Sequence, residues 1–183
     1  VAVAILQSRR NAVGAASLIL LLLALAWWDT TYAIFWAGTP GLTKYFWLDI
    51  TYLGAVSVPT ALFVFSMQIT NHQGWLKRPF VSLLYLEPIL VLTCLFTDPY
   101  HGLFFAGRRA ENSAVILDAG PVFWLNVVYS YALILISTLL LVRTYLHSSG
   151  IFRSQVVVVL LGLSITWLNS IISTGEQPIT NET

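Results

Sequence analysis

Residues 86–105 read LEPILVLTCLFTDPYHGLFF, an apolar run that ends in a polar corner. Glu87 and Pro88 lie inside the run, although a charged group in a membrane segment costs free energy and a proline removes one helical hydrogen bond. The apolar run ends at the polar segment Thr97-Asp98-Pro99-Tyr100-His101, which is followed by Phe104 and Phe105. We therefore expect a membrane helix followed by a polar, aromatic-lined corner, which is a candidate place to hold a ligand.

The composition of the whole chain agrees with a membrane location. Of its 183 residues, 57% are hydrophobic and only 9% are charged, whereas soluble domains carry roughly 25% charged residues. Apolar runs long enough to cross about 30 Å of hydrocarbon occur at residues 12–36, 47–70, 79–97, 121–146 and 152–174. Because lipid offers no partners for backbone polar groups, such spans must be helices. The prediction is an all-α, polytopic helical membrane bundle that forms one domain over residues 1–183.

The two ends of the chain suggest that it is an excerpt. It starts without Met on an apolar stretch, VAVAIL, and ends in the polar segment GEQPITNET. A signal peptide would place its charge before the apolar stretch, and here the arginines follow it. We expect a longer protein of which this chain is a part.

The basic residues predict the orientation. With five spans, alternate loops lie on opposite sides, and one side collects Arg9, Arg10, Lys77, Arg78, Arg143 and Arg153. The other side has Lys44, Arg108 and Arg109 together with most of the acidic residues. Since short cytoplasmic loops are enriched in Lys and Arg, the first residues should be cytoplasmic and the last external. The corner after residue 97 then lies on the external face.

Several polar residues fall within or beside the predicted spans. Asp29, Asp49 and Asp98 lie in the external half and could form a ligand or cation pocket, or could instead make interhelical hydrogen bonds. For Asn126 and Asn169, interhelical hydrogen bonding is the preferred interpretation. Glu87 is predicted to face a cavity or a partner helix inside the membrane.

Other features concern the shape of the helices. Pro59 and Pro88 predict helix kinks. Gly54, Ser57 and Ala61 are small residues at helical spacing, which would let another helix approach closely.

The chain lacks the usual marks of an enzyme or cofactor protein. No histidine lies mid-span to bind haem, and Lys44 and Lys77 lie near span ends, so no retinal-type Schiff base is expected. Asp98 and His101 are too few ligands for a metal, and Cys94 is expected to be a packing residue. Neither a catalytic motif nor the charge excess of a nucleic-acid-binding protein occurs. We predict no catalytic residues, no metal and no cofactor.

Short motifs along most of the chain resemble a known family, the amino-terminal seven-transmembrane region of bacterial sensor histidine kinases. The resemblance covers about residues 12–175. It is carried by Tyr52, Gly54, Pro59, Phe63 and Phe65, then by Thr97, Pro99 and His101, then by Gly120, Pro121, Phe123 and Trp124, and then by Tyr129, Ser130, Tyr131, Arg153 and Gln155. The chain departs from the family pattern at several positions: Asp98 replaces the usual Asn, Asn126 a common His, and Glu87 an apolar residue. The proline often found in the next-to-last span is also absent, and Ser164 and Ile165 occupy that region.

The resemblance implies a function and a location. The five spans would be the second to sixth of seven helices in a bacterial inner membrane, and the region would be a sensory input domain that signals to a cytoplasmic output module. The ligand, a small molecule of unknown identity, is expected near Asp98, His101, Trp124 and Tyr129, with Asp29 beneath them. Candidate partners are the lipid bilayer, a second copy of the chain and other membrane subunits.

Two other functions remain open at this point. The chain could be a non-catalytic integral-membrane subunit of a larger complex, with Glu87 and the small residues of the second span against partner helices. A small transporter with Asp29 and Glu87 as a proton relay is a third hypothesis, although no inverted repeat is evident.

Overall fold

The computed structural model describes residues 14–38, 42–70, 74, 78–111, 114–147 and 157. The chain divides into two compact units, Val1–Ser137 and Thr138–Thr183. Within the described residues, the second unit contains the last turns of helix α6 and Val157. The first unit contains all the features discussed below.

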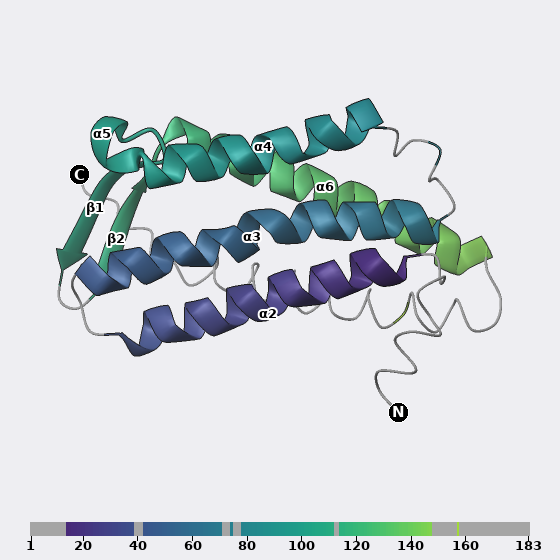
Figure 1. Ribbon diagram of the computed structural model, residues 1–183, viewed down its shortest axis with the longest axis horizontal. Helices are drawn as coiled ribbons and strands as arrows, with labels where there is room; N and C mark the ends of the chain where they lie inside the picture. Colours follow the sequence, from purple (N-terminus) through teal and green to yellow (C-terminus); the bar gives the residue numbers. More distant parts are fainter. Residues whose placement is uncertain are drawn as a thin grey trace, which may run out of the picture. The chain divides into compact units, whose positions relative to one another are not determined.

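Four long helices dominate the described part of the chain (Figure 1): α2 (Ala15–Ala37), α3 (Leu42–Ile69), α4 (Arg78–Phe96) and α6 (Pro121–His147). Each is long and apolar enough to cross a membrane. They confirm the predicted helical membrane bundle and agree, within a few residues at each end, with the first four predicted spans. The fifth predicted span, residues 152–174, lies outside the described residues.

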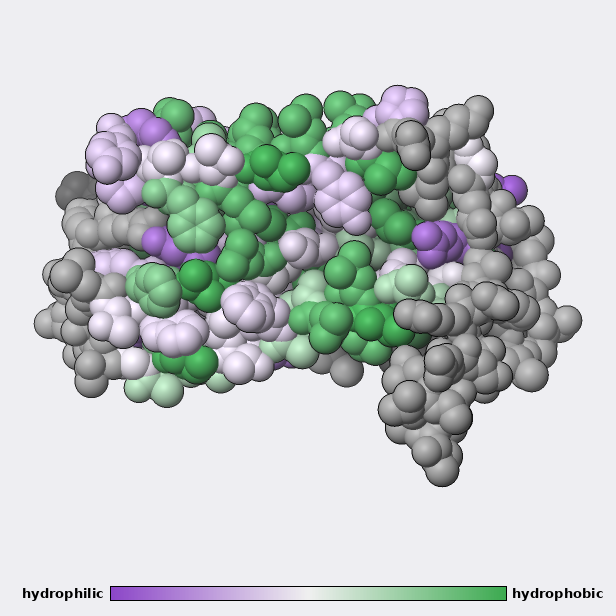
Figure 2. Space-filling view, viewed as in Figure 1, coloured by the Kyte–Doolittle hydropathy of each residue, from purple (hydrophilic) through white to green (hydrophobic). Residues whose placement is uncertain are grey.

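Helix α3 is the central helix of the first unit. In its most apolar window 67% of the residues are buried, against 22% in the corresponding windows of α2, α4 and α6. The large apolar side chains exposed on these other helices, such as Leu23, Leu83 and Val128, would face lipid in a bilayer. Figure 2 shows such hydrophobic side chains over much of the visible face.

The small-residue surface of α3 packs on α2. A Cβ atom at Gly54 would lie only 2.8 Å from the backbone nitrogen of Trp28 and 2.9 Å from the carbonyl oxygen of Ala24. Two hydrogen bonds fix the pair elsewhere, from Trp27 Nε1 to the Ile50 carbonyl (3.1 Å) and from Ser17 Oγ to Gln68 Oε1 (2.8 Å). At Gly54, the predicted close approach is therefore made by α2, a helix of the same chain.

The connection between α4 and α6 is folded and compact. It contains the short helix α5 (Asp98–His101) and an antiparallel hairpin of β1 (Phe105–Glu111) and β2 (Ala114–Ala119). Gly102 lies between helix and hairpin with φ +60°, a backbone conformation that favours glycine.

Candidate functional site

The corner between α4 and β1 is organised around the carboxylate of Asp98, which is only 4% exposed. Its Oδ1 accepts hydrogen bonds from the backbone N–H groups of Phe104 (2.8 Å) and Phe105 (3.2 Å), and its Oδ2 also accepts from Phe105 (3.2 Å). The N–H of Gly102 donates to the Asp98 carbonyl oxygen at 2.8 Å. Asp98 therefore holds the chain in a reversal, since a buried carboxylate needs such donors.

The imidazole of His101 closes the outer side of the same turn. Its Nδ1 accepts a hydrogen bond from the N–H of Leu103 (3.0 Å), and its Nε2 lies 2.9 Å from Thr97 Oγ1. The hydroxyl of Thr97 already donates to the Thr93 carbonyl at 2.7 Å. Because that hydroxyl has one proton, Nε2 must be the donor to it, which assigns the neutral Nε2–H tautomer to His101.

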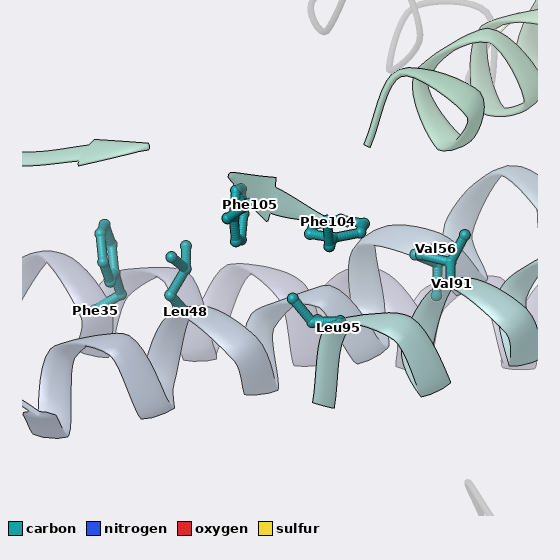
Figure 3. Packing of buried hydrophobic residues seen from close by; sticks show 7 residues of the cluster. All are labelled: Phe35, Leu48, Val56, Val91, Leu95, Phe104 and Phe105. Carbon is teal, nitrogen blue, oxygen red and sulfur yellow. The ribbon is translucent and has the colours of Figure 1, made fainter. Parts of the chain in front are cut away.

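Aromatic rings form the inner side of the corner. Phe104 and Phe105 are buried, with ring centroids 4.8 Å apart. Tyr52 of α3 lies 5.1 Å from Phe104, and Phe123 of α6 lies 5.8 Å from it, both in edge-to-face geometry. Figure 3 shows Phe104 and Phe105 in the buried cluster together with Leu95 of α4. These two rings on the inner side of the corner thus contact helices α3 and α6.

Gly120 and Pro121 connect the corner to α6. The N–H of Gly120 donates to the Phe104 carbonyl (2.8 Å), and that of Val122 donates to the Leu103 carbonyl (3.1 Å). Any Cβ atom at Gly120 would collide with the Leu103 carbonyl. Steric constraints therefore explain the Gly-Pro pair. Glycine at position 120 permits the close approach of the Leu103 carbonyl, and proline at position 121 suits the first turn of a helix.

The outer surface of the corner is aromatic and accessible. Tyr100 is 90% exposed, and His101 and Leu103 of the same turn are also exposed, as is Trp124 in the first turn of α6. The structure thus brings two predicted site residues, Asp98 and His101, to this corner, with Asp98 inside and His101 outside. Trp124 lies in the first turn of α6, which hydrogen bonds of Gly120 and Val122 join to the corner.

Tyr129 does not join the corner. Its hydroxyl donates to the carbonyl oxygen of Leu84 at 2.7 Å, and Leu84 lies 12 residues before the end of α4 at Phe96, about 18 Å along the helix axis. Asp29 is exposed on α2, and among the described residues no hydrogen bond or ion pair joins it to the corner. Tyr129 therefore lies elsewhere than the sequence suggested, and the placement of Asp29 beneath the corner stays a prediction.

A second polar group lies within the spans. Asn126 Nδ2 donates to Glu87 Oε1 at 3.0 Å, which links α6 to α4. This confirms the predicted interhelical role of Asn126. Thr60 of α3 is only 1% exposed, and its burial among the helices was not expected from the sequence. The sequence around Thr60 does not indicate which residues of other helices this side chain contacts.

The described residues contain no cluster of three or more His, Cys, Asp or Glu side chains that could hold a metal. Pro59 and Pro88 lie inside continuous helices, and the kinks expected at them stay a prediction.

Comparison with known proteins identifies the family. The model of the N-terminal 7TM region of histidine kinase matches residues 1–181, which is nearly the whole chain. No curated protein and no solved structure matches it. Together with the apolar helices, this match makes the chain a multi-pass region in a lipid bilayer with a part in signal transduction. The chain belongs to the family of N-terminal seven-transmembrane regions of histidine kinases, the membrane sensory part of those proteins.

Proposed function

We propose that this region receives a signal at its external face, at the corner of residues 97–105, and passes it to a cytoplasmic output module. The observation that carries the proposal is the double role of this corner. Its outer side exposes Tyr100 and His101, and its inner side places Phe104 and Phe105 among the helices.

The connection from outer to inner side is short. His101 accepts from the N–H of Leu103, and the next two N–H groups donate to Asp98. A ligand that binds one arrangement of His101 better than another would change this backbone and with it the contacts of Phe104 with Tyr52 and Phe123. A ligand shifts a conformational equilibrium only through such differential affinity. The corner offers both an accessible imidazole and a packed aromatic pair that responds to it.

The external placement of the corner rests on the distribution of basic residues. The opposite side of the spans has six Lys and Arg residues and no acid, as expected for cytoplasmic loops. We further propose a bacterial inner membrane as the location, with a small molecule or a membrane component as the stimulus.

A non-catalytic subunit of a membrane complex is the alternative function. It was based on Glu87 and on the small residues around Gly54, both taken as contacts for partner helices. In this structure Asn126 contacts Glu87, and Trp28 covers Gly54. These two features therefore favour a partner subunit no more than they favour a sensor.

The test uses the full-length protein in its native membrane. A kinase module encoded after the spans supports the proposal, and a complete gene without an output module contradicts it. His101→Ala should change the dependence of autophosphorylation on external conditions, while Tyr85→Phe, a change on an exposed ring of α4 outside the corner, should not. Membrane levels of each variant should be compared by immunoblot. If His101→Ala is present at normal levels and signals as the wild type does under all conditions, the corner is not the sensing site.

A further inference from the structure

The imidazole of His101 lies where the uptake of one proton would break a hydrogen bond of the backbone. Its Nδ1 accepts from the N–H of Leu103 at 3.0 Å, and its Nε2–H donates to Thr97 Oγ1 at 2.9 Å. Nδ1 is thus the ring nitrogen that can take up a proton, because Nε2 already carries one. A protonated Nδ1 would be a donor that faces the N–H of Leu103, and two donors cannot bond to each other.

The carboxylate of Asp98 is in a position to accept from that new donor. Its Oδ1 lies 4.0 Å from His101 Nδ1, which is too far for a hydrogen bond in this structure. The same oxygen accepts the backbone N–H groups of Phe104 and Phe105. A protonated ring that moves towards Asp98 would therefore compete with these two donors for one oxygen, while it releases the N–H of Leu103.

Asp98 is the charged group that faces the imidazole. Thr97, which follows α4, is neutral, and the titratable Tyr100 of α5 is 90% exposed. Among the residues that the structure describes, Asp118 of β2 forms no ion pair with His101, and the first turn of α6 contains no acid. A protonated imidazole would therefore find its opposite charge in the buried carboxylate of Asp98.

Protons can reach this ring from water. The side chain of His101 is 29% exposed, and α5 lies outside the four helices that could cross a membrane. Histidine is the side chain that ordinarily changes its charge between about pH 5 and pH 8. The distribution of basic residues places the corner on the external side. External acid in this range could thus act on the corner without crossing the membrane.

We propose that His101 is a proton switch for the backbone of the corner, and that external acid is the stimulus that the corner transmits. Nδ1 takes one proton from external water, the ring becomes an imidazolium, and Nε2 keeps its bond to Thr97. The N–H of Leu103 loses its acceptor. The ring turns towards Asp98 and weakens the bonds of its carboxylate to Phe104 and Phe105.

The two halves of this proposal differ in what they require. The switch follows from the hydrogen bonds of the corner and does not depend on any signalling role. The assignment of acid as the stimulus rests on the proposed function of the corner, and it adds the proton to the stimuli named there.

The variant His101→Asn separates this proton from other effects of acid. The Oδ1 atom of asparagine is as many bonds from the backbone as Nδ1 of histidine, and it accepts from the N–H two residues further on in an Asx turn. It binds no proton in this pH range. The bond to Thr97 is lost at every pH, and Asp98 and Tyr100 are present in both proteins. His147→Asn, the same change at the last residue of α6, is the matched control.

Two measurements on the full-length protein in proteoliposomes test the switch. Amide exchange at residues 103–105, followed by mass spectrometry, is compared between wild type and His101→Asn at equal pH, so that the pH dependence of the exchange chemistry cancels. Between about pH 8 and pH 5 the ratio of wild type to variant should rise about tenfold, the effect of one lost hydrogen bond. His147→Asn should behave as the wild type does.

The second measurement is the nitrogen-15 NMR spectrum of histidine-labelled protein. The difference between wild type and His101→Asn should show a neutral Nε2–H ring at the higher pH and an imidazolium at the lower pH. A ring that stays neutral at the lower pH, or an exchange ratio that does not change with pH, would overturn the switch.

The stimulus is tested separately, by autophosphorylation in oriented proteoliposomes at constant internal pH. External acid should change the activity of the wild type and of His147→Asn, but not that of His101→Asn. An acid response that His101→Asn retains, or a wild type that does not respond, excludes acid as the stimulus even if the switch works. If the switch fails but His101→Ala still alters signalling, the proton is excluded and the corner remains the sensing site.

Discussion

The hydroxyl of Tyr129 in α6 donates a hydrogen bond to the carbonyl oxygen of Leu84 in α4, at 2.7 Å. In a regular α-helix that carbonyl would accept from the N–H of residue 88. Residue 88 is Pro88, which has no N–H. The tyrosine therefore supplies the donor that the proline removes, and Asn126, one turn earlier in α6, bonds to Glu87, one turn later in α4. These paired bonds join the two helices as antiparallel neighbours.

The first prediction concerns the tyrosine hydroxyl that takes the place of the missing backbone N–H at Pro88. Tyr129→Phe should lower the free energy of unfolding by about 1 kcal/mol, because the Leu84 carbonyl loses this donor within the membrane. In a Pro88→Ala background the restored N–H of residue 88 can bond to Leu84, so the same tyrosine change should cost much less. Unfolding in mixed micelles measures both values.

Tyr85→Phe is the control for this cycle, since Tyr85 is an exposed tyrosine of the same helix. An equal cost of Tyr129→Phe with and without Pro88 would show that the proline and the tyrosine are independent.

The second prediction concerns the pair of Glu87 and Asn126. Asn126→Leu leaves Glu87 without its hydrogen-bond donor, so it should destabilise the protein by about 1–3 kcal/mol. The double variant Glu87→Leu with Asn126→Leu replaces both polar groups by apolar ones and should be more stable than Asn126→Leu alone. Unfolding free energies of the single and double variants provide the check, and the reverse order of stability would exclude the pair as the source of the loss.

The third prediction concerns the backbone at the corner. Asp98→Asn replaces one carboxylate oxygen by an amide donor that faces the N–H of Phe105, so the reversal should open more often. Hydrogen bonds to charged groups are worth about 1.5–3 kcal/mol, so amide exchange at Phe104 and Phe105 should increase by about ten- to a hundredfold. Mass spectrometry after deuterium labelling measures it.

Tyr100→Phe serves as the comparison for the corner, because it alters a ring that is 90% exposed. Unchanged exchange at residues 104 and 105 in Asp98→Asn would mean that the carboxylate does not hold the reversal.

The fourth prediction concerns the close contact between α2 and α3. Gly54→Ala introduces a Cβ atom 2.8 Å from the Trp28 backbone nitrogen, so the helices must separate, at a cost of about 1–3 kcal/mol. Gly74→Ala is the matched control, since a Cβ atom there meets nothing within 4 Å. Thermal unfolding in detergent compares the two, and equal midpoints would show that the helices lie further apart than the structure indicates.

The membrane location, the helical class and four of the spans could be predicted from the amino-acid sequence. They follow from length and hydropathy alone, because a long apolar segment in lipid can satisfy its backbone only as a helix. The polar part of the corner, residues 97–101, could be located in the same way, since a charge next to a proline ends an apolar run. The order of the short motifs also indicated the histidine kinase family.

Which polar residues meet depends on the tertiary structure. Tyr129 was expected at the corner, but its hydroxyl bonds to the Leu84 carbonyl in the middle of α4. In a span that is apolar on all sides, hydropathy does not reveal which face points to which neighbour. The donors to Asp98 come from residues that Gly102 turns back towards it, and Asn126 of α6 meets Glu87 of α4. These contacts depend on helix rotation and depth, which the packing of side chains sets and which the one-dimensional pattern of the chain does not contain.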